Sequence, residues 1–279
     1  MNAETLSVPG RPRTTDPRIE QRPALLTIPE LTHYFAKLCA VNQFSLTVRQ
    51  GELIGLIGPN GAGKTTIFNL ITGVYRASRG KIIWDGIDLV GLPSYEIVQM
   101  GIARTFQSIR LFQRLSVLDN VCIAYHPHAG YGLGSSIFQG PHYQRKESEL
   151  IHQAQEFLAI FGLEERQNDM AGSLPYGMQR RLEIARALAA NPRLLLLDEP
   201  AAGMNPQEIE ELMLLIRLIR DRFELTIILI EHRMRLVMSI CEWLTVMNFG
   251  EVIAQDTPEQ IQQNPTVIDA YLGRQDEDK

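Results

Sequence analysis

The sequence contains few cysteines and no long apolar run. Only three cysteines occur in 279 residues, Cys39, Cys122 and Cys241, and they show neither metal-site spacing nor an even disulfide framework. We therefore expect reduced cysteines in a cytosolic protein. No stretch approaches the roughly 18 apolar residues that a membrane-spanning helix needs. Any action at a membrane would therefore require a partner.

A basic excess is also absent. The sequence has 27 Lys and Arg against 32 Asp and Glu, a formal net charge of -5, whereas nucleic-acid binders are usually basic. Residues 1–28 are polar and rich in Pro and Arg, without the apolar core of a secretory signal, and are predicted to be a disordered extension. Residues 126–142 are rich in Gly, Pro and His. We interpret them as an exposed loop rather than a metal site, because no further ligands occur at regular spacing.

Short apolar segments alternate with helical ones along the chain. Residues 53–57, 194–197 and 226–230 are mostly apolar, as in parallel strands that are buried on both faces. This alternation predicts an α/β fold with a largely parallel sheet. Further strands are expected at 44–48 and 81–84, a hairpin at 246–252, and helices at 66–71, 149–161, 178–190, 208–222 and 258–272.

A glycine-rich loop follows the first of these apolar strands. Gly58, Gly63, Lys64 and Thr65 match the pattern GxxxxGK[ST], with a strand before it and a helix after it, which is the context that the motif requires. Its glycines allow backbone N–H groups to point at phosphate oxygens, Lys64 adds a positive charge, and the Thr65 hydroxyl can bind Mg²⁺. The other residues predicted to hold the nucleotide are Asn60, Gly61, Ala62 and Thr66.

Acidic residues follow the apolar segment at 194–197. Asp198 at the tip of a strand can hold Mg²⁺, and Glu199 can act as a general base toward the attacking water. An apolar strand with an acidic turn is common by itself, but the phosphate loop upstream favours the catalytic interpretation. His232 is a candidate to contact the γ-phosphate and the water, and Gln107 to complete the metal shell. Each of these two also fits a structural or surface role.

The order of these elements resembles the nucleotide-binding subunit of an ABC transporter. In chain order they are the phosphate loop at 58–65, Gln107, a signature segment at 174–179, the acidic strand at 194–198, Glu199 and His232. The resemblance covers residues 29–273 and implies a P-loop NTPase fold of the ABC ATPase type. That fold has a RecA-like core, an antiparallel β subdomain and an inserted α-helical subdomain. The implied domains are a nucleotide-binding domain at 29–253, its helical subdomain at about 94–178, and a helical tail at 254–279.

The resemblance also implies ATP and Mg²⁺ as cofactors. In this family an aromatic side chain of an early strand stacks on the base, and Phe35 is the best match, with Tyr34 as the second choice. Thr65, Gln107 and Asp198 are the implied Mg²⁺ residues.

The signature departs from the usual LSGGQ of the family. Pro175 and Tyr176 replace the usual Ser and first Gly, and Met178 replaces Gln. The hydroxyl that would contact a γ-phosphate is therefore lost, although Gly177 keeps its N–H and the helix dipole remains. We expect Gly177 to face the partner subunit's ATP with fewer donors around it.

A second departure points to one subfamily. Asn205 stands where the family usually has Asp. Both departures, together with residues 40–42, 103–112 and the long tail at 257–273, resemble the ATP-binding subunits of branched-chain amino acid transporters (LivG-type). Relatives that move other neutral amino acids, aromatic acids or urea share much of this pattern.

This resemblance implies an importer ATPase at the cytoplasmic face of the inner membrane. The implied partners are a second ABC ATPase subunit, as a heterodimer rather than a homodimer, two integral membrane permease subunits and a substrate-binding protein, with no nucleic acid. Each ATP would lie between the phosphate loop of one ATPase and the signature of the other. The helical segment at 94–178 is expected to dock on the membrane subunit near Ile109, Leu111 and Phe112, although apolar residues of this kind also fit a core.

Two other classes share the phosphate loop. A non-transport ATPase of the same superfamily typically has a long coiled coil or two tandem cassettes, and this acidic chain has neither. A small-molecule or nucleoside kinase would not need the helix at 178–190 directly before the acidic strand. The cargo stays open, because an ATPase subunit does not touch it.

Overall fold

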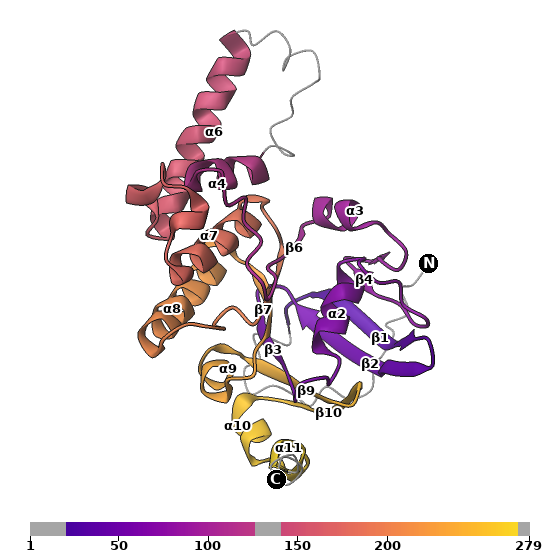
Figure 1. The fold of residues 1–279 in the computed structure, drawn as a ribbon. Coiled ribbons are helices and arrows are strands. Elements are labelled where there is room, and N and C mark those ends of the chain that lie inside the picture. Colours follow the sequence, from indigo (N-terminus) through magenta and orange to yellow (C-terminus); the bar gives the residue numbers. More distant parts are fainter. Residues whose placement is uncertain (1–20, 126–140, 273–279) are drawn as a thin grey trace. The chain divides into compact units, whose positions relative to one another are not determined.

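The computed structural model describes residues 21–125 and 141–272. The chain divides into two compact units, Met1–Gln99 with Ile219–Lys279 and Met100–Leu218, and each is described by itself. Most of the predicted N-terminal extension and nearly all of the predicted loop at 126–142 lie outside the described residues. Figure 1 shows the elements of both units.

An antiparallel sheet opens the first unit. Its four strands are β1 (Ala24–Phe35), β2 (Leu38–Arg49), β4 (Ile83–Trp84) and β5 (Ile87–Asp88), in the order β2-β1-β4-β5. Alternate residues in the second half of β2 are buried, which confirms the strand predicted at 44–48. The strand predicted at 81–84 is shorter, because the N–H of Ile82 donates to the Asp88 side chain and not to a backbone carbonyl.

Parallel strands form the core of the first unit. β3 (Leu53–Ile57) pairs in parallel with both β8 (Thr226–Ile230) and β9 (Trp243–Asn248). β10 (Glu251–Asp256) runs antiparallel to β9, so the predicted hairpin at 246–252 is present but longer. Every residue of β3 and β8 is buried, as predicted for strands covered on both faces.

Close packing against β3 explains the glycine at its centre. A Cβ atom at Gly55 would lie 2.6 Å from the Leu244 side chain and 2.7 Å from that of Val237. Val237 belongs to α9 (Met234–Ile240), so this helix lies directly on β3. Two further helices belong to this unit: α2 (Lys64–Ile71) begins at the end of the phosphate loop, and α3 (Ser94–Gln99) comes later in the chain.

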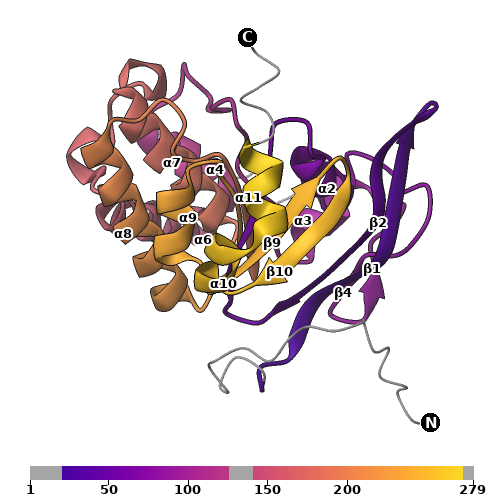
Figure 2. The same ribbon diagram turned by 90° about the horizontal axis from the view of Figure 1, so that it is seen from below.

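The predicted helix at 258–272 is two helices. α10 (Pro258–Gln263) and α11 (Pro265–Leu272) are separated by Asn264, which has a ψ of 116°. A residue before proline disfavours the helical region, so the helix stops there. The Asn264 side chain accepts the N–H of Thr266 and so starts the next helix. Figure 2 shows α10 and α11 beside β9 and β10.

The second unit combines two strands with helices. β6 (Ile102–Arg104) pairs in parallel with β7 (Leu194–Asp198), whose residues are all buried. The helices α4 (Val117–Tyr125), α6 (Pro141–Ile160) and α7 (Tyr176–Ala189) contact one another. Two short 3-10 helices, Glu164–Arg166 and Ala171–Ser173, precede α7. α8 (Pro206–Phe223) begins in this unit and ends in the first.

Most predicted helices are present with shifted ends. α6, α7 and α8 contain most or all of the helices predicted at 149–161, 178–190 and 208–222. β6 was not expected, since three residues are too few to show a periodicity. No helix among the described residues is both long and apolar enough to cross a membrane.

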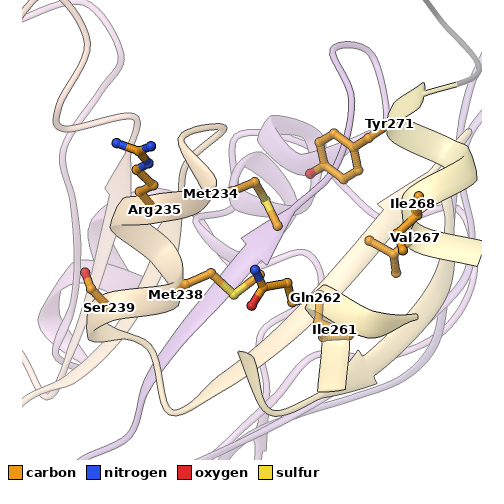
Figure 3. A pocket seen from close by; sticks show the side chains of 9 residues that line it. All are labelled: Met234, Arg235, Met238, Ser239, Ile261, Gln262, Val267, Ile268 and Tyr271. Atoms are coloured by element: carbon orange, nitrogen blue, oxygen red, sulfur yellow. The ribbon is translucent and has the colours of Figure 1, made fainter. Parts of the chain in front are cut away.

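A cavity of about 650 Å³ lies in the first unit between α9 and the two C-terminal helices (Figure 3). Met234 and Met238 of α9 face Ile261 and Val267 across it. The Tyr271 side chain also lines this space. Such an apolar lining does not suit a polyphosphate, so the cavity is not the nucleotide site.

Burial of Tyr271 predicts a loss of stability at high pH. Burial raises the pKa of Tyr271 from 10.0 to about 12. A folded-state pKa above the unfolded value gives stability that is complete below the unfolded pKa and disappears as pH rises through the folded pKa. We expect the free energy of unfolding, measured by urea titration, to fall from about pH 10 to about pH 12. The free energy of unfolding of the Tyr271→Phe variant should fall less over this pH range. An equal fall in the two proteins would show that Tyr271 does not cause the loss of stability.

Candidate functional site

The phosphate loop connects β3 to α2 in the first unit. The backbone of Gly61 and Gly63 lies in the left-handed region, with φ of 78° and 100°. A Cβ atom at Gly63 would lie 2.7 Å from the Ala40 carbonyl oxygen, whereas one at Gly61 would meet nothing within 4 Å. The loop is therefore held against β2 at Gly63 and open at Gly61, which leaves room for an anion.

Lys64 is folded over this loop. Its side chain is buried, and its ammonium group donates hydrogen bonds to the carbonyl oxygens of Gly58, at 2.7 Å, and Pro59, at 2.9 Å. Lys64 is also the first residue of α2, where N–H groups have no partner within the helix. A fixed cation beside a helix N-terminus attracts phosphate, so this donor set fits the triphosphate of a nucleotide.

The other loop residues differ in exposure. Asn60 and Thr65 are exposed and Thr66 is partly buried, so a ligand can reach their side chains. Ala62 is buried, and its carbonyl accepts the N–H of Gly250, at 3.1 Å. Ala62 therefore anchors the loop.

Phe35 lies in a cluster of aromatic rings. Its ring meets those of His33 and Tyr75 edge-on, with centroids 4.7 and 5.2 Å away. Tyr75 follows α2, and its N–H donates to the Asn69 carbonyl. Phe35 is therefore tied to the segment after the phosphate-loop helix. Phe35 and Tyr34 are equally exposed, at 41%, so exposure does not choose between them as the stacking residue.

His232 follows β8, which neighbours β3 in the same sheet. Leu56 of β3 pairs with Ile230 of β8, so the two strands end side by side, and His232 and the phosphate loop leave the sheet at the same edge. The His232 side chain is half exposed, and the backbone N–H of His232 donates to the buried carboxylate of Glu231. Sequence reasoning missed Glu231, which holds the turn that carries His232.

Asp198 ends β7 in the second unit. Its carboxylate is 3% exposed and accepts a hydrogen bond from the Arg104 guanidinium at 2.8 Å. Arg104 ends β6, so the parallel pairing of the two strands brings the charges together. No three His, Cys, Asp or Glu side chains gather as a metal site in the described parts of the chain. A single carboxylate such as Asp198 suits Mg²⁺, which is usually bound through one or two carboxylates plus phosphate oxygens and water.

Glu199 and Gln107 meet in the second unit. The Gln107 side-chain amide donates to the Glu199 carboxylate at 2.9 Å. Glu199 has a φ of 46°, a left-handed conformation that is uncommon outside glycine and asparagine. Such strained residues concentrate at functional sites. The structure thus brings together two of the predicted catalytic residues.

The signature segment starts α7. Gly177 is buried, and a Cβ atom there would lie 2.9 Å from the Glu208 carboxylate. The Tyr176 ring, in place of the usual glycine, packs over Gly203. Gln179 donates its amide to the Leu174 carbonyl, at 2.8 Å, which fixes the entry to the helix. α7 has no side-chain cap, so its N-terminus offers backbone N–H groups.

Asn205 has a clear structural role. The N–H of Glu208 donates to the Asn205 side chain, at 3.0 Å, and the Asn205 N–H donates to the Glu208 carboxylate, at 2.9 Å. This reciprocal pair is a capping box at the start of α8. The Asn that departs from the family's usual Asp therefore still caps this helix.

Phe112 is 49% exposed, with the Arg186 guanidinium 5.5 Å from its ring centroid. Ile109 and Leu111 are partly buried. Membrane-subunit docking at these residues stays a prediction.

The predicted site residues thus divide between the units. The phosphate loop, Phe35 and His232 lie in the first unit, and Gln107, Gly177, Asp198 and Glu199 lie in the second. Sequence reasoning missed Arg104 as the partner of Asp198. Its signal was an arginine three residues before Gln107, at the end of an unrecognised strand.

A buried strand, a glycine loop and a buried lysine at the start of a helix define a P-loop nucleoside triphosphatase. The ABC transporter family model matches residues 41–202. A second model, that of branched-chain amino acid ATP-binding cassette transporters, matches residues 251–277.

Several curated proteins are similar over nearly the whole chain. The high-affinity branched-chain amino acid transport ATP-binding protein BraF of Pseudomonas aeruginosa is 45% identical over 249 residues, 89% of this chain and 98% of that protein. LivG of Escherichia coli, with the same description, is 47% identical over the same shares. The lipopolysaccharide export system ATP-binding protein LptB of Haemophilus influenzae is 35% identical over 90% of this chain and 98% of that protein.

Solved structures share the fold. An ATP-binding cassette of an ABC transporter in its ADP conformation has a TM-score of 0.78 and 29% identity, over 90% of this chain and 99% of that one. A nucleotide-free cassette has a TM-score of 0.77 and 30% identity, over 89% and 99%. The chain therefore belongs to the ABC transporter family.

Two loop glycines provide a matched test of the phosphate loop. Gly61→Ala should destabilise the fold by about 1 kcal/mol, the cost of a left-handed alanine. Gly63→Ala should cost about 2 kcal/mol more, since its methyl group meets a backbone carbonyl that cannot move freely. Urea denaturation of both variants measures the difference. Equal losses would show that the loop is not held against β2 at Gly63.

Proposed function

We propose that this chain is the ATP-binding and hydrolysing subunit of an ABC importer for branched-chain or other neutral amino acids, acting through separate membrane subunits. The observation that carries the catalytic part is the Gln107–Glu199 hydrogen bond next to the buried Asp198. The amino acid cargo rests on the 45–47% identity to branched-chain amino acid transport proteins, against 35% to an export protein.

In this proposal each residue has one task. The phosphate loop and Lys64 bind the β- and γ-phosphates, and Phe35 stacks on the adenine. Thr65, Asp198 and Gln107 hold Mg²⁺, which when bound neutralises developing phosphate charge. Glu199 accepts a proton from the attacking water, and His232 contacts the γ-phosphate.

We place the proposed residues in three parts of the chain. Residues 29–253 are the nucleotide-binding domain, with a helical subdomain at about 94–178. Residues 1–28 are an extension and 254–279 a helical tail. The tail contains α10 and α11, next to the apolar cavity.

The incomplete signature supports a proposal for the assembly. Gly177 keeps its N–H for a partner's ATP, but the neighbouring hydroxyl is absent. We therefore propose a heterodimer with a second ATPase whose complete signature serves this chain's phosphate loop. Two permease subunits and a substrate-binding protein complete the importer, with this chain at the cytoplasmic face of the inner membrane.

Glu199→Gln in the assembled transporter should lower ATP turnover on the order of a hundredfold or more, because the general base is lost. ATP binding, measured by equilibrium dialysis, should remain. Lys64→Ala should instead weaken binding, and the exposed Glu210→Gln serves as the control with normal turnover. Near-normal turnover of Glu199→Gln would refute the catalytic assignment.

Affinity purification of the tagged chain from membranes tests the proposed assembly. We expect a second, different ATPase and two integral membrane proteins in stoichiometric amounts, identified by mass spectrometry. In that complex Gly177→Asp should reduce turnover less than Glu199→Gln, because it impairs only the weaker site. Recovery of this chain as a homodimer without membrane proteins would contradict the heterodimer.

A further inference from the structure

A buried ion pair inside the second unit holds the segment that carries Gln107. Arg180 on α7 is completely buried, and its guanidinium donates to the Glu183 carboxylate at 2.6 Å. The same guanidinium donates to the carbonyl oxygens of Phe106, at 2.7 Å, and Gln107, at 2.8 Å. One side chain therefore fixes two successive peptide groups.

The second carboxylate oxygen of Glu183 contacts the same segment. That oxygen accepts the N–H groups of Phe106 and Arg110, each at 3.3 Å. Residues 105–110 form neither helix nor strand, so their backbone groups need partners from elsewhere. Arg180 and Glu183 supply four of these partners. Within the segment, the centre of the Phe106 ring also lies 4.2 Å from the Arg110 guanidinium.

The segment links the signature helix to the proposed base. Gln107 donates to Glu199 from the side chain while its carbonyl is held by Arg180. Arg180 lies one turn after Tyr176, whose hydroxyl is 3.4 Å from the same guanidinium. A continuous series of contacts therefore connects Tyr176, at the start of α7, to the Glu199 carboxylate through Arg180 and Gln107.

The burial of the Arg180–Glu183 pair indicates that its role is to position the segment at 105–110 rather than to stabilise the fold. Removing two charges from water is costly, and a buried ion pair often contributes less stability than apolar residues would. Arg181, the next residue, instead makes an exposed ion pair with Glu211 on α8. The same helix thus carries a matched surface pair that holds no loop.

We propose that Arg180, together with Glu183, is a positioning residue that sets Gln107 against Glu199 and couples this contact to the signature helix. The proposal rests on the proposed function of Glu199. Arg180 itself touches no nucleotide in this scheme, and it acts only through the backbone of residues 106–110.

Arg180→Lys tests the proposal in the assembled transporter. Lysine keeps a positive charge beside Glu183 but cannot reach two carbonyls in the fixed fork of a guanidinium. We expect kcat for ATP hydrolysis to fall about tenfold with an unchanged KM, because a displaced catalytic group loses rate and not binding. Glu211→Gln, which removes only the surface pair, should keep wild-type kcat.

A double variant separates positioning from independent effects. If Arg180 acts through Gln107, Arg180→Lys combined with Gln107→Ala should be no slower than Gln107→Ala alone. Multiplied losses would overturn the proposal, as would a normal kcat in Arg180→Lys.

Hydrogen exchange of the purified chain gives a readout without catalysis. The amides of Phe106 and Arg110 should exchange at least about tenfold faster in Arg180→Lys than in Glu211→Gln, because their acceptor is no longer fixed. Unchanged exchange would overturn the proposal even if turnover falls. Turnover retained in Glu199→Gln would instead reject the proposed function, while the exchange result would still decide whether Arg180 holds the segment.

Discussion

Burial of the parallel strands on both faces is the constraint on which the site depends. β3 and β8 in the first unit and β7 in the second are buried at every residue. Only the carboxylate that ends β7 is charged within these strands. Polar functional groups therefore collect where the strands end. In the first unit β3 and β8 are parallel, so the phosphate loop and His232 leave the sheet at the same edge. In the second unit Glu199 directly follows β7.

Two buried ion pairs lie in the second unit. Arg104 meets Asp198, and Arg180 meets Glu183, with little or no exposure. Neither pair is an efficient source of stability, because the desolvation of two ions offsets most of their attraction. The Arg104–Asp198 pair joins β6 to β7, and the Arg180–Glu183 pair of α7 hydrogen-bonds the backbone of residues 106–110. The short segment from Arg104 to Arg110 is thereby attached to β7 at one end and to α7 at the other.

Structural elements that depend on residues close together in the sequence are predictable from the sequence alone. The apolar strands, the phosphate loop and α7 each depend on residues near in sequence, so their positions were predicted within a few residues. β6 was missed because three residues give no periodicity, and the break at Asn264 was missed although Pro265 signals it. The roles predicted for Phe35, Gln107 and His232 stay predictions, since geometry alone does not assign chemistry.

The sequence by itself determined the fold class, the phosphate loop and the family, because those follow from local spacing and from the order of motifs. Only the tertiary structure decided which side chains meet. Arg104 with Asp198, Gln107 with Glu199, and Arg180 with the backbone at 106–107 join residues that are 73 to 94 positions apart. Such contacts depend on strand order and helix packing, which no local pattern records.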